Sequence, residues 1–420
     1  MMTWIYRLIL LVLVFGVSAL SHGGNALSPW LDRLVNVSAL LGMPALVLCY
    51  FRLPGLYRAL AWPLLLGVVL LMLESKHEYG QYVYSYFVIK RFFFCGLALV
   101  AFYVASRAEP LRLDYAVYLI FAFFFINQLL LGQIFRYALT SETRTTIAPD
   151  ALYLVIPFLY YFVRYLKEHR LIHLFGTLAT FGLIVFLLHR SVISTAVGAA
   201  GVVLGLAVTG RLASGGLPVG RTLLTFSVLL LLVAPTLSLL PETKVNAFLE
   251  NIGGIFAPKE DETGSWRVEQ SEFYLSLIPE RPVFGWRYAG YDRGEIMENE
   301  DFPEKGTIIH SQYIDMLYNY GAFGLLLNLL LIVGTLVSIY RRNRVFSTEQ
   351  TVLFGFIAGG LVFAISYQLP VYYWSLVGVG MYLGRCRPLR WHYADAAPDE
   401  AAQPDCSRQR PALSNPPIPV

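Results

Sequence analysis

Three side chains able to do chemistry stand beside long apolar runs. Arg190 lies between two such runs in FLLHRSVIS, Arg267 lies in WRVEQSEFYL, and His310 precedes a third run. A guanidinium grips phosphate oxygens with a planar fork, and two of them can stabilise the charge on a departing diphosphate. A histidine can take a proton from an attacking hydroxyl near neutral pH. These residues are therefore predicted to be catalytic and to act on a membrane-bound polyprenyl diphosphate that carries a sugar.

Four more residues could bind the same substrate. Lys90 and Arg91 lie about one turn inside the outer end of an apolar run and could hold phosphate. Gln270 shares a helical face with Arg267 because it lies three residues further on. Trp266 could stack on a sugar ring. The first two could equally be interfacial anchors, and Trp266 could belong to the aromatic belt of a membrane protein.

Simpler interpretations exist for the three catalytic candidates as well. Arg190 could be an interfacial residue whose charged end reaches water while its stem lies along apolar surface. Arg267 could pair with Glu269 or Glu272 on a solvated helix. His310 could be an ordinary residue at a helix start. The occurrence of all three at one predicted membrane face favours a shared chemical role.

The composition sets the fold class. Hydrophobic residues make up 56% of the 420 residues and charged residues 14%, whereas a soluble domain has about 25% charged residues. Apolar runs of roughly 17–25 residues recur, and each is long enough to cross a bilayer. The runs are continuous, unlike the alternating strands of a membrane β-barrel. The sequence therefore predicts an all-α polytopic membrane protein.

We expect twelve transmembrane helices, arranged as nine in residues 1–240 and three in 312–385. Their expected ranges are about 4–20, 34–51, 59–73, 84–104, 114–133, 150–166, 171–188, 191–209, 222–240, 312–338, 349–367 and 369–384. One large loop, 241–311, separates the ninth helix from the tenth. In the tenth, Gly321 and Gly324 are expected to let neighbouring helices approach.

The basic residues of the short connections predict the orientation. One alternate set carries Arg52, Arg58, Arg107, Arg112, Arg164, Lys167, Arg170, Arg211, Arg221, Arg341, Arg342, Arg344, Arg385, Arg387 and Arg390. The other set carries only Arg33, Lys76, Arg136, Arg144 and Arg190. Because short cytoplasmic loops are rich in Lys and Arg, the first set and both termini are predicted to be cytoplasmic. The loop 241–311 and Arg190 then lie on the outer face.

The outer loop is expected to contain short amphipathic helices. Ser265 is a good N-cap, and Pro279 and Pro282 end an apolar pattern, which predicts a helix over 266–278. Acidic runs at 259–262 and 298–301 lack a D-x-D motif and are expected to be solvated. We therefore expect no metal and no cofactor. The tail 386–420 is expected to be a disordered cytoplasmic segment.

Three stretches carry a resemblance to a known family. They are LLHRS, WRVEQSEFYLSLIPERPVFGW and IIHSQYIDMLYNYGAFGL. With the twelve-helix layout, they resemble the O-antigen ligase and O-antigen polymerase superfamily of bacterial inner-membrane glycosyltransferases. The resemblance implies a GT-C-like fold and an inverting, metal-independent transfer from an undecaprenyl diphosphate-linked glycan. It also implies that Arg190 and Arg267 bind the diphosphate and that His310 is the base or positions the acceptor.

The acceptor and the member of the superfamily stay open at this stage. A ligase would use lipid A–core, a polymerase of O-antigen or exopolysaccharide would use a second lipid-linked glycan, and a third type would use a protein hydroxyl; we favour the ligase. The chain has His310-Ser311 where the family often has His-Asn, and Gly285-Trp286-Arg287 where it often has Gly-x-Gly. The stretch YQLPVYYW, at the last outer turn, lacks the arginine that many ligases carry there. A transporter of lipid-linked glycan is the alternative from another class, although no internal repeat typical of transporters is evident.

Overall fold

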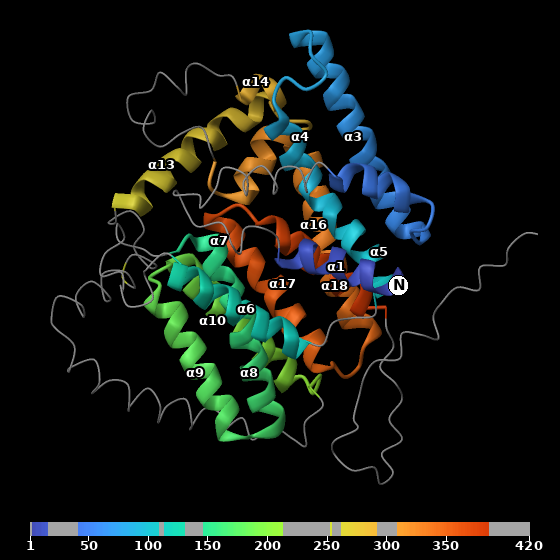
Figure 1. Cartoon of the computed structure of the whole chain (residues 1–420). Helices are drawn as coiled ribbons and strands as arrows, with labels where there is room; N and C mark the ends of the chain where they lie inside the picture. Colours follow the sequence, from blue (N-terminus) through green and yellow to red (C-terminus); the bar gives the residue numbers. More distant parts are fainter. Residues whose placement is uncertain are drawn as a thin grey trace, which may run out of the picture.

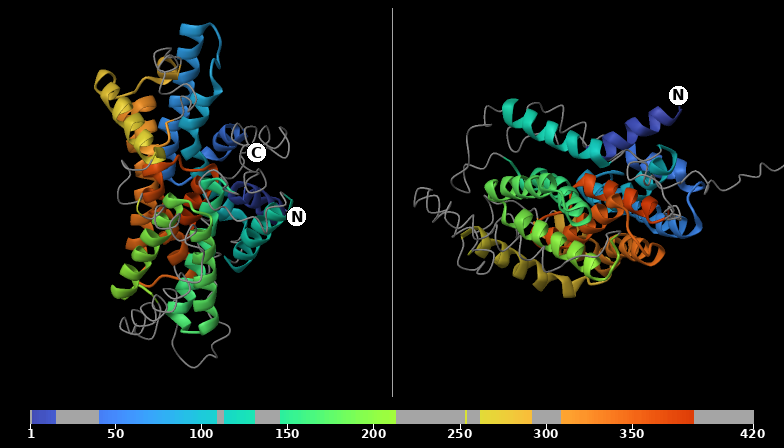
Figure 2. Two further views of the ribbon diagram at one scale, coloured as in Figure 1. Left: turned by 90° about the vertical axis from the view of Figure 1, so that its left-hand side faces the viewer. Right: turned by 90° about the horizontal axis from the view of Figure 1, so that it is seen from below.

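The computed structural model describes residues 2–15, 41–108, 113–130, 146–212, 253, 262–291 and 309–385. The predicted ninth helix at 222–240, the acidic run at 298–301 and the tail 386–420 lie outside the described residues. The described part is helical, with one isolated β-bridge between Leu212 and Phe346. Figure 1 shows the helices gathered in a bundle, with α13 and α14 at the opposite end from the turn between α8 and α9. The side view in Figure 2 shows the same arrangement.

The helices have the following bounds. They are α1 Met2–Phe15, an apolar helix Leu41–Tyr50, α3 Gly55–Tyr79, α4 Tyr86–Phe93, η1 Phe94–Gly96, α5 Leu97–Ala108, α6 Leu113–Leu130, α7 Ala148–Ala151, η3 Leu152–Leu154, α8 Val155–Glu168, α9 Leu171–Phe186, α10 Arg190–Val208, α13 Glu262–Leu277, η5 Ile278–Glu280, α14 Arg287–Tyr291, α16 Gln312–Arg342, α17 Thr348–Ser366 and α18 Val371–Leu383. Every predicted transmembrane range other than 222–240 overlaps one of these helices.

Five described helices are long and apolar enough to cross a membrane. They are Gly55–Tyr79, Tyr86–Ala108, Arg190–Val208, Gln312–Arg342 and Thr348–Ser366. The other apolar helices of the described part are shorter, such as Leu171–Phe186 and Val371–Leu383. The all-α membrane class is therefore confirmed. Twelve spans, the orientation and the outer placement of 241–311 stay predictions.

Small residues let α10 and α17 pack closely and set their register. A Cβ built on Gly355 would lie 2.9 Å from Val203, and one on Gly359 would lie 2.9 Å from Ala199. Residue numbers rise along α17 as they fall along α10, so the two helices are antiparallel. Extending the same pairing places the first residue of α10 level with the residues that directly follow α17. These two helix ends therefore lie at one end of the bundle.

The helix α16 is broken at Gly321. This residue has φ 64° and ψ −164°, a backbone conformation that L residues with a side chain rarely adopt. The freed N–H groups of Ala322 and Phe323 donate to the carbonyls of Pro282 and Val283 over 2.8 and 3.1 Å. Lost helical bonds are thus replaced by bonds to the loop between η5 and α14, as a broken helix near a membrane requires.

The expectation for the two glycines of α16 is corrected by this geometry. A Cβ on Gly321 would lie 2.3 Å from the carbonyl carbon of Val283, so the close neighbour is the loop backbone and not a neighbouring helix. At Gly324 the nearest atom to such a Cβ is the Cβ of Tyr320, on the same α16. The spacing of the two glycines suggested a helix–helix contact. Spacing alone gives no information on the backbone break at Gly321.

An aromatic cluster packs α13 against the first half of α16. Tyr274, Trp286, Ile309 and Tyr318 are buried together, and the rings of Tyr274 and Tyr318 meet edge-on with centroids 4.8 Å apart. The indole N–H of Trp286 donates to the carbonyl of Leu277 over 3.1 Å. This cluster fixes the direction in which the rest of α13 points.

The helix predicted over 266–278 exists, but its start is wrong. It begins at Glu262, so Ser265 lies inside the first turns and is not the N-cap. Residues 262–264, which precede it, are already helical. The regular α13 ends at Leu277, and Pro279 lies in the short helix η5 that follows.

Substituting Gly321 by alanine should break the contact between α16 and the loop that joins η5 to α14. Alanine at this φ and ψ, a region that essentially only glycine occupies, costs about 1–3 kcal/mol, and its methyl group would overlap the Val283 carbonyl, so the total loss should exceed the backbone cost. Gly334→Ala is the matched control on the same helix, because nothing lies within 4 Å of its added Cβ. Thermal unfolding in detergent micelles measures both. Equal stability of the two variants would contradict the docking role of Gly321.

Candidate functional site

The side chains of Arg267 and His310 meet at Tyr367, the residue that follows α17. Nη2 of Arg267 donates a 2.9 Å hydrogen bond to the Tyr367 hydroxyl, and the guanidinium carbon lies 4.7 Å from the centre of the Tyr367 ring. The His310 ring meets the same tyrosine edge-on, with centroids 6.1 Å apart. All three residues are half-buried. The structure thus brings two of the three catalytic candidates together around one tyrosine.

The surroundings of His310 keep its imidazole neutral. Burial, and then the positive charge of Arg267, lower the pKa of His310 to about 4, from an ordinary value of about 6.5. Both causes disfavour the charged imidazolium. At neutral pH the ring therefore has a lone pair available to accept a proton.

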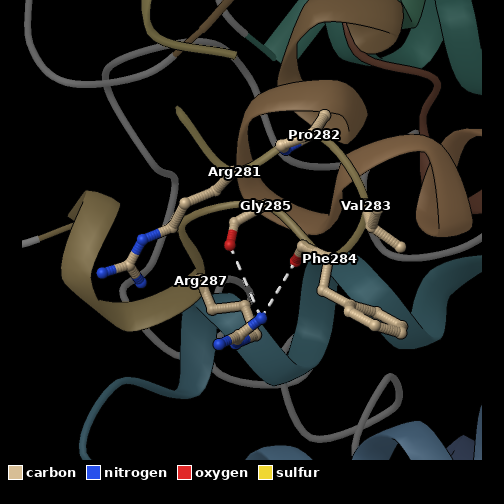
Figure 3. Close-up of a pocket in the computed structure, with 6 residues that line it drawn as sticks. All are labelled: Arg281, Pro282, Val283, Phe284, Gly285 and Arg287. Carbon is tan, nitrogen blue, oxygen red and sulfur yellow. Dashed lines mark hydrogen bonds between the residues drawn. The ribbon is translucent and has the colours of Figure 1, made fainter. Parts of the chain in front are cut away.

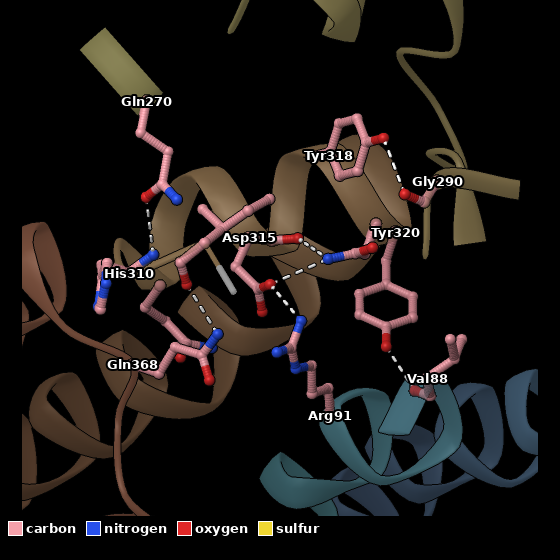
Figure 4. Close-up of polar contacts among 12 residues, drawn as sticks. Val88, Arg91, Gln270, Gly290, His310, Asp315, Tyr318, Tyr320 and Gln368 are labelled. Carbon is pink, nitrogen blue, oxygen red and sulfur yellow. Dashed lines mark hydrogen bonds and ion pairs between the residues drawn. The ribbon is translucent and has the colours of Figure 1, made fainter. Parts of the chain in front are cut away.

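Hydrogen bonds hold the segment that carries His310 against the turn between α17 and α18. Nε2 of Gln368 donates to the carbonyl of Ile309 over 2.8 Å, as Figure 4 shows. The backbone N–H of Leu369 donates to Oε1 of Gln312 over 3.0 Å. These bonds lie on both sides of His310, so the position of its backbone is fixed relative to the turn.

The face of α13 that was predicted to carry Arg267 is the face turned to the protein. Gln270 and Tyr274 on this face are both 2% exposed, whereas Glu269 and Glu272 are exposed. Oε1 of Gln270 accepts a long hydrogen bond of 3.5 Å from the backbone N–H of His310 (Figure 4). Gln270 therefore lies at the candidate site.

Lys90 and Arg91 lie on α4, which packs against α16. Arg91 donates to the carboxylate of Asp315 over 3.0 Å, and Asn319 donates to the same oxygen over 2.9 Å. Asp315 is 1% exposed, so this ion pair is buried. The Lys90 ammonium lies 5.3 Å from the ring centre of Tyr86. Their predicted role in substrate binding stays a prediction. Arg91 meanwhile links α4 to the first half of α16.

Arg190 lies at the same end of the bundle but on another helix. It is half-buried and is the first residue of α10. The preceding His189 is buried, and its Nε2 lies 2.8 Å from the carbonyl oxygen of Thr146. From the register of α10 and α17, Arg190 lies level with Tyr367. The side chain of Trp266 lies outside the described residues, so only its place in α13 is known.

A surface hollow lies on the loop between η5 and α14 (Figure 3). It is lined by Arg281, Pro282, Val283, Phe284, Gly285 and Arg287. The Arg287 guanidinium binds the carboxylate of Glu74 on α3 over 2.7 and 2.8 Å. Arg287 has φ 52°, a backbone conformation that residues other than glycine adopt uncommonly.

These contacts define a helical membrane protein with a neutral histidine and an arginine held together at one end of its bundle. Residues 137–329 match the family described as O-Antigen ligase. This match confirms the predicted resemblance to the O-antigen ligase and polymerase superfamily. The match supports a membrane glycosyltransferase of this type. A search of curated proteins gives no match.

The matched range contains the three catalytic candidates, whereas two residues of the described site were missed by sequence reasoning. Tyr367 lies beyond the matched range, in YQLPVYYW, where the sequence prediction concerned only the missing arginine. Asp315 lies within the expected tenth span, and a carboxylate in an apolar run signals a buried basic partner. That signal could have identified the pair with Arg91.

The lowered pKa of His310 predicts an unusual pH profile. A general base acts only when unprotonated, so kcat/KM should stay constant as the pH falls from 7 and decline only near the pKa of about 4. Initial rates of glycan transfer by the purified enzyme, with folding checked at each pH, measure this profile. A decline centred near pH 6.5 would contradict the environment described for this histidine.

Removing one member of the buried ion pair should cost more than removing both. Asp315→Leu leaves the Arg91 charge uncompensated and should lower the free energy of unfolding by about 3–5 kcal/mol. The double variant Asp315→Leu, Arg91→Leu should lose clearly less. Denaturant unfolding in mixed micelles gives the comparison. Additive losses would show that the two side chains do not interact.

Proposed function

We propose that the protein transfers a glycan from undecaprenyl diphosphate to an acceptor hydroxyl at the periplasmic face of the bacterial inner membrane. The observation that carries the proposal is the convergence of Arg267 and a neutral His310 within the O-Antigen ligase match. A general base beside a fixed cation suits attack on a carbon whose leaving group is a diphosphate.

In the proposed reaction His310 takes the proton of the acceptor hydroxyl. The hydroxyl oxygen then bonds to the anomeric carbon while the bond from that carbon to the diphosphate oxygen breaks. The departing diphosphate keeps the electron pair, and Arg267 and Arg190 stabilise its growing negative charge. A single displacement of this kind inverts the anomeric centre. It needs no metal, so a chelator should leave transfer by the purified enzyme intact.

Arg190 supports this reaction by its position rather than by a contact with the other two residues. Its helix begins level with the turn that carries Tyr367, at the same end of the bundle as Arg267. A lipid-linked donor has its diphosphate at the membrane surface, so a permanent cation at a helix end is suitably placed. Lys90, Gln270 and Trp266 are proposed to add contacts to the donor, whereas Arg91, whose guanidinium is paired with the Asp315 carboxylate, is proposed to help only by holding α4 against α16.

We favour lipid A–core as the acceptor, which makes the protein an O-antigen ligase. The family description matches this choice. A polymerase that uses a second lipid-linked glycan is the alternative within the superfamily. A transporter would not need a neutral histidine beside an arginine at one surface.

A deletion strain complemented with plasmid variants tests the proposal. Loss of a ligase should leave bare lipid A–core while lipid-linked polymer accumulates, and wild-type plasmid should restore long lipopolysaccharide. Arg190→Ala and His310→Ala should fail, because one such stabilising group or base contributes about 10²–10³-fold or 10²–10⁴-fold in rate. Arg190→Lys, which keeps charge but loses the fork, should restore partially.

The gel patterns separate the alternatives. Core carrying one repeat unit would identify a polymerase. Unchanged lipopolysaccharide in the deletion strain would contradict both O-antigen activities. Full restoration by Arg190→Ala or His310→Ala, at normal protein levels, would remove that residue from the mechanism.

A further inference from the structure

We propose that Tyr367 is a positioning residue, which holds the Arg267 guanidinium beside His310 without cancelling its positive charge. The inference rests on the proposed function, because it assigns a role within the same site. Tyr367 lies outside the residues matched to the family.

Two contacts to one tyrosine fix the end of the Arg267 side chain. The hydroxyl accepts its 2.9 Å hydrogen bond, and the ring face lies 4.7 Å from its guanidinium carbon. Arginine has many rotamers, so an unheld side chain would spend little time at one place. A ring and a hydroxyl together restrict both the place and the tilt of the guanidinium plane.

The tyrosine is itself held in a fixed position. Its N–H donates to the carbonyl of Phe363 over 3.0 Å, and its ring stacks on the Phe363 ring with centroids 5.3 Å apart. The next residue, Gln368, is bonded to the carbonyl of Ile309, directly before His310. The tyrosine is therefore placed relative to the histidine by a short chain of hydrogen bonds.

The neutral hydrogen-bond partner of Arg267 distinguishes it from Arg91 and Arg287. Arg91 is paired with the Asp315 carboxylate, and Arg287 is paired with Glu74. Among the described side chains, the hydrogen-bond partner of Arg267 is the Tyr367 hydroxyl. A carboxylate would neutralise the guanidinium and repel a diphosphate. A hydroxyl orients the guanidinium and leaves its charge for a ligand.

The same contact links Tyr367 to the protonation of His310. The described groups that face His310 are Arg267 and Gln270 on α13 and Tyr367 after α17, and the paired Asp315 lies further along α16. Burial lowers the pKa of His310 most, and among these groups the positive charge of Arg267 lowers it further. If the guanidinium loses its hydroxyl partner and moves away, the pKa of His310 should rise towards its ordinary value.

Tyr367→Phe removes the hydroxyl and keeps the ring. Tyr313→Phe is the matched control, because it removes a hydroxyl of α16 that donates over 2.7 Å to the Leu361 carbonyl of α17, a neutral partner away from Arg267. In Tyr367→Phe, kcat for glycan transfer should fall about tenfold or more, since a bond to a charged group is lost where transition-state charge develops. Tyr367→Leu, which also lacks the ring, should lose more, and Tyr313→Phe should stay near wild type.

Histidine hydrogen–deuterium exchange, read by mass spectrometry, measures the pKa of His310 without any glycan substrate. That pKa should rise in Tyr367→Phe and in Arg267→Gln but not in Tyr313→Phe. In an Arg267→Gln background, adding Tyr367→Phe should change neither the pKa nor the rate further, because the tyrosine acts through the arginine.

The outcomes separate the positioning role from the proposed function. An unchanged pKa of His310 in Tyr367→Phe, an equal rise in Tyr313→Phe, or additive effects with Arg267→Gln would overturn the positioning role. Wild-type protein that transfers no glycan but shows the expected pKa pattern would overturn the proposed function and support the positioning role.

Discussion

At Gly321 the backbone of α16 leaves the helical ladder, and the next two N–H groups bond to carbonyls of the loop between η5 and α14. Near hydrocarbon, unsatisfied backbone groups are too costly to persist, so the break and the loop require each other. The loop carries Trp286 into the cluster with Tyr274, and this cluster directs α13. The placement of Arg267 thus depends on a backbone conformation more than fifty residues away in the chain.

Electrostatic pairing distinguishes Arg91 and Arg287 from Arg267. A buried charge is tolerated when it is paired, as for Arg91 with Asp315, and such pairs hold helices in place. Arg287, paired with Glu74, ties the loop to α3 in the same way. Arg267 is oriented by a hydroxyl instead. A site that must attract a diphosphate needs a cation whose charge has not been cancelled by the fold.

The sequence predicted the all-α membrane class and the helix that carries Arg267, because apolar length and helical spacing are local properties. It did not predict the break at Gly321, since glycine in a membrane helix also suits close helix packing. Ser265 was misplaced as the cap because the helix begins three residues earlier, although Thr263 and Gly264 are weak helix formers, so local propensity does not decide this boundary. Tyr367 was missed because aromatic residues are common in this chain, and its role depends on which arginine folds against it.

The register of α10 and α17 places Arg190 at the same end of the bundle as Arg267 and His310. Small residues at Gly355 and Gly359 allow one close antiparallel alignment, and that alignment places the start of α10 beside the end of α17. Arg190 and Tyr367 are far apart in sequence but level in the bundle. Helix packing, rather than any loop, therefore sets the depth at which a second guanidinium would meet the diphosphate. The close contacts in the middle of these helices consequently determine the geometry at their ends.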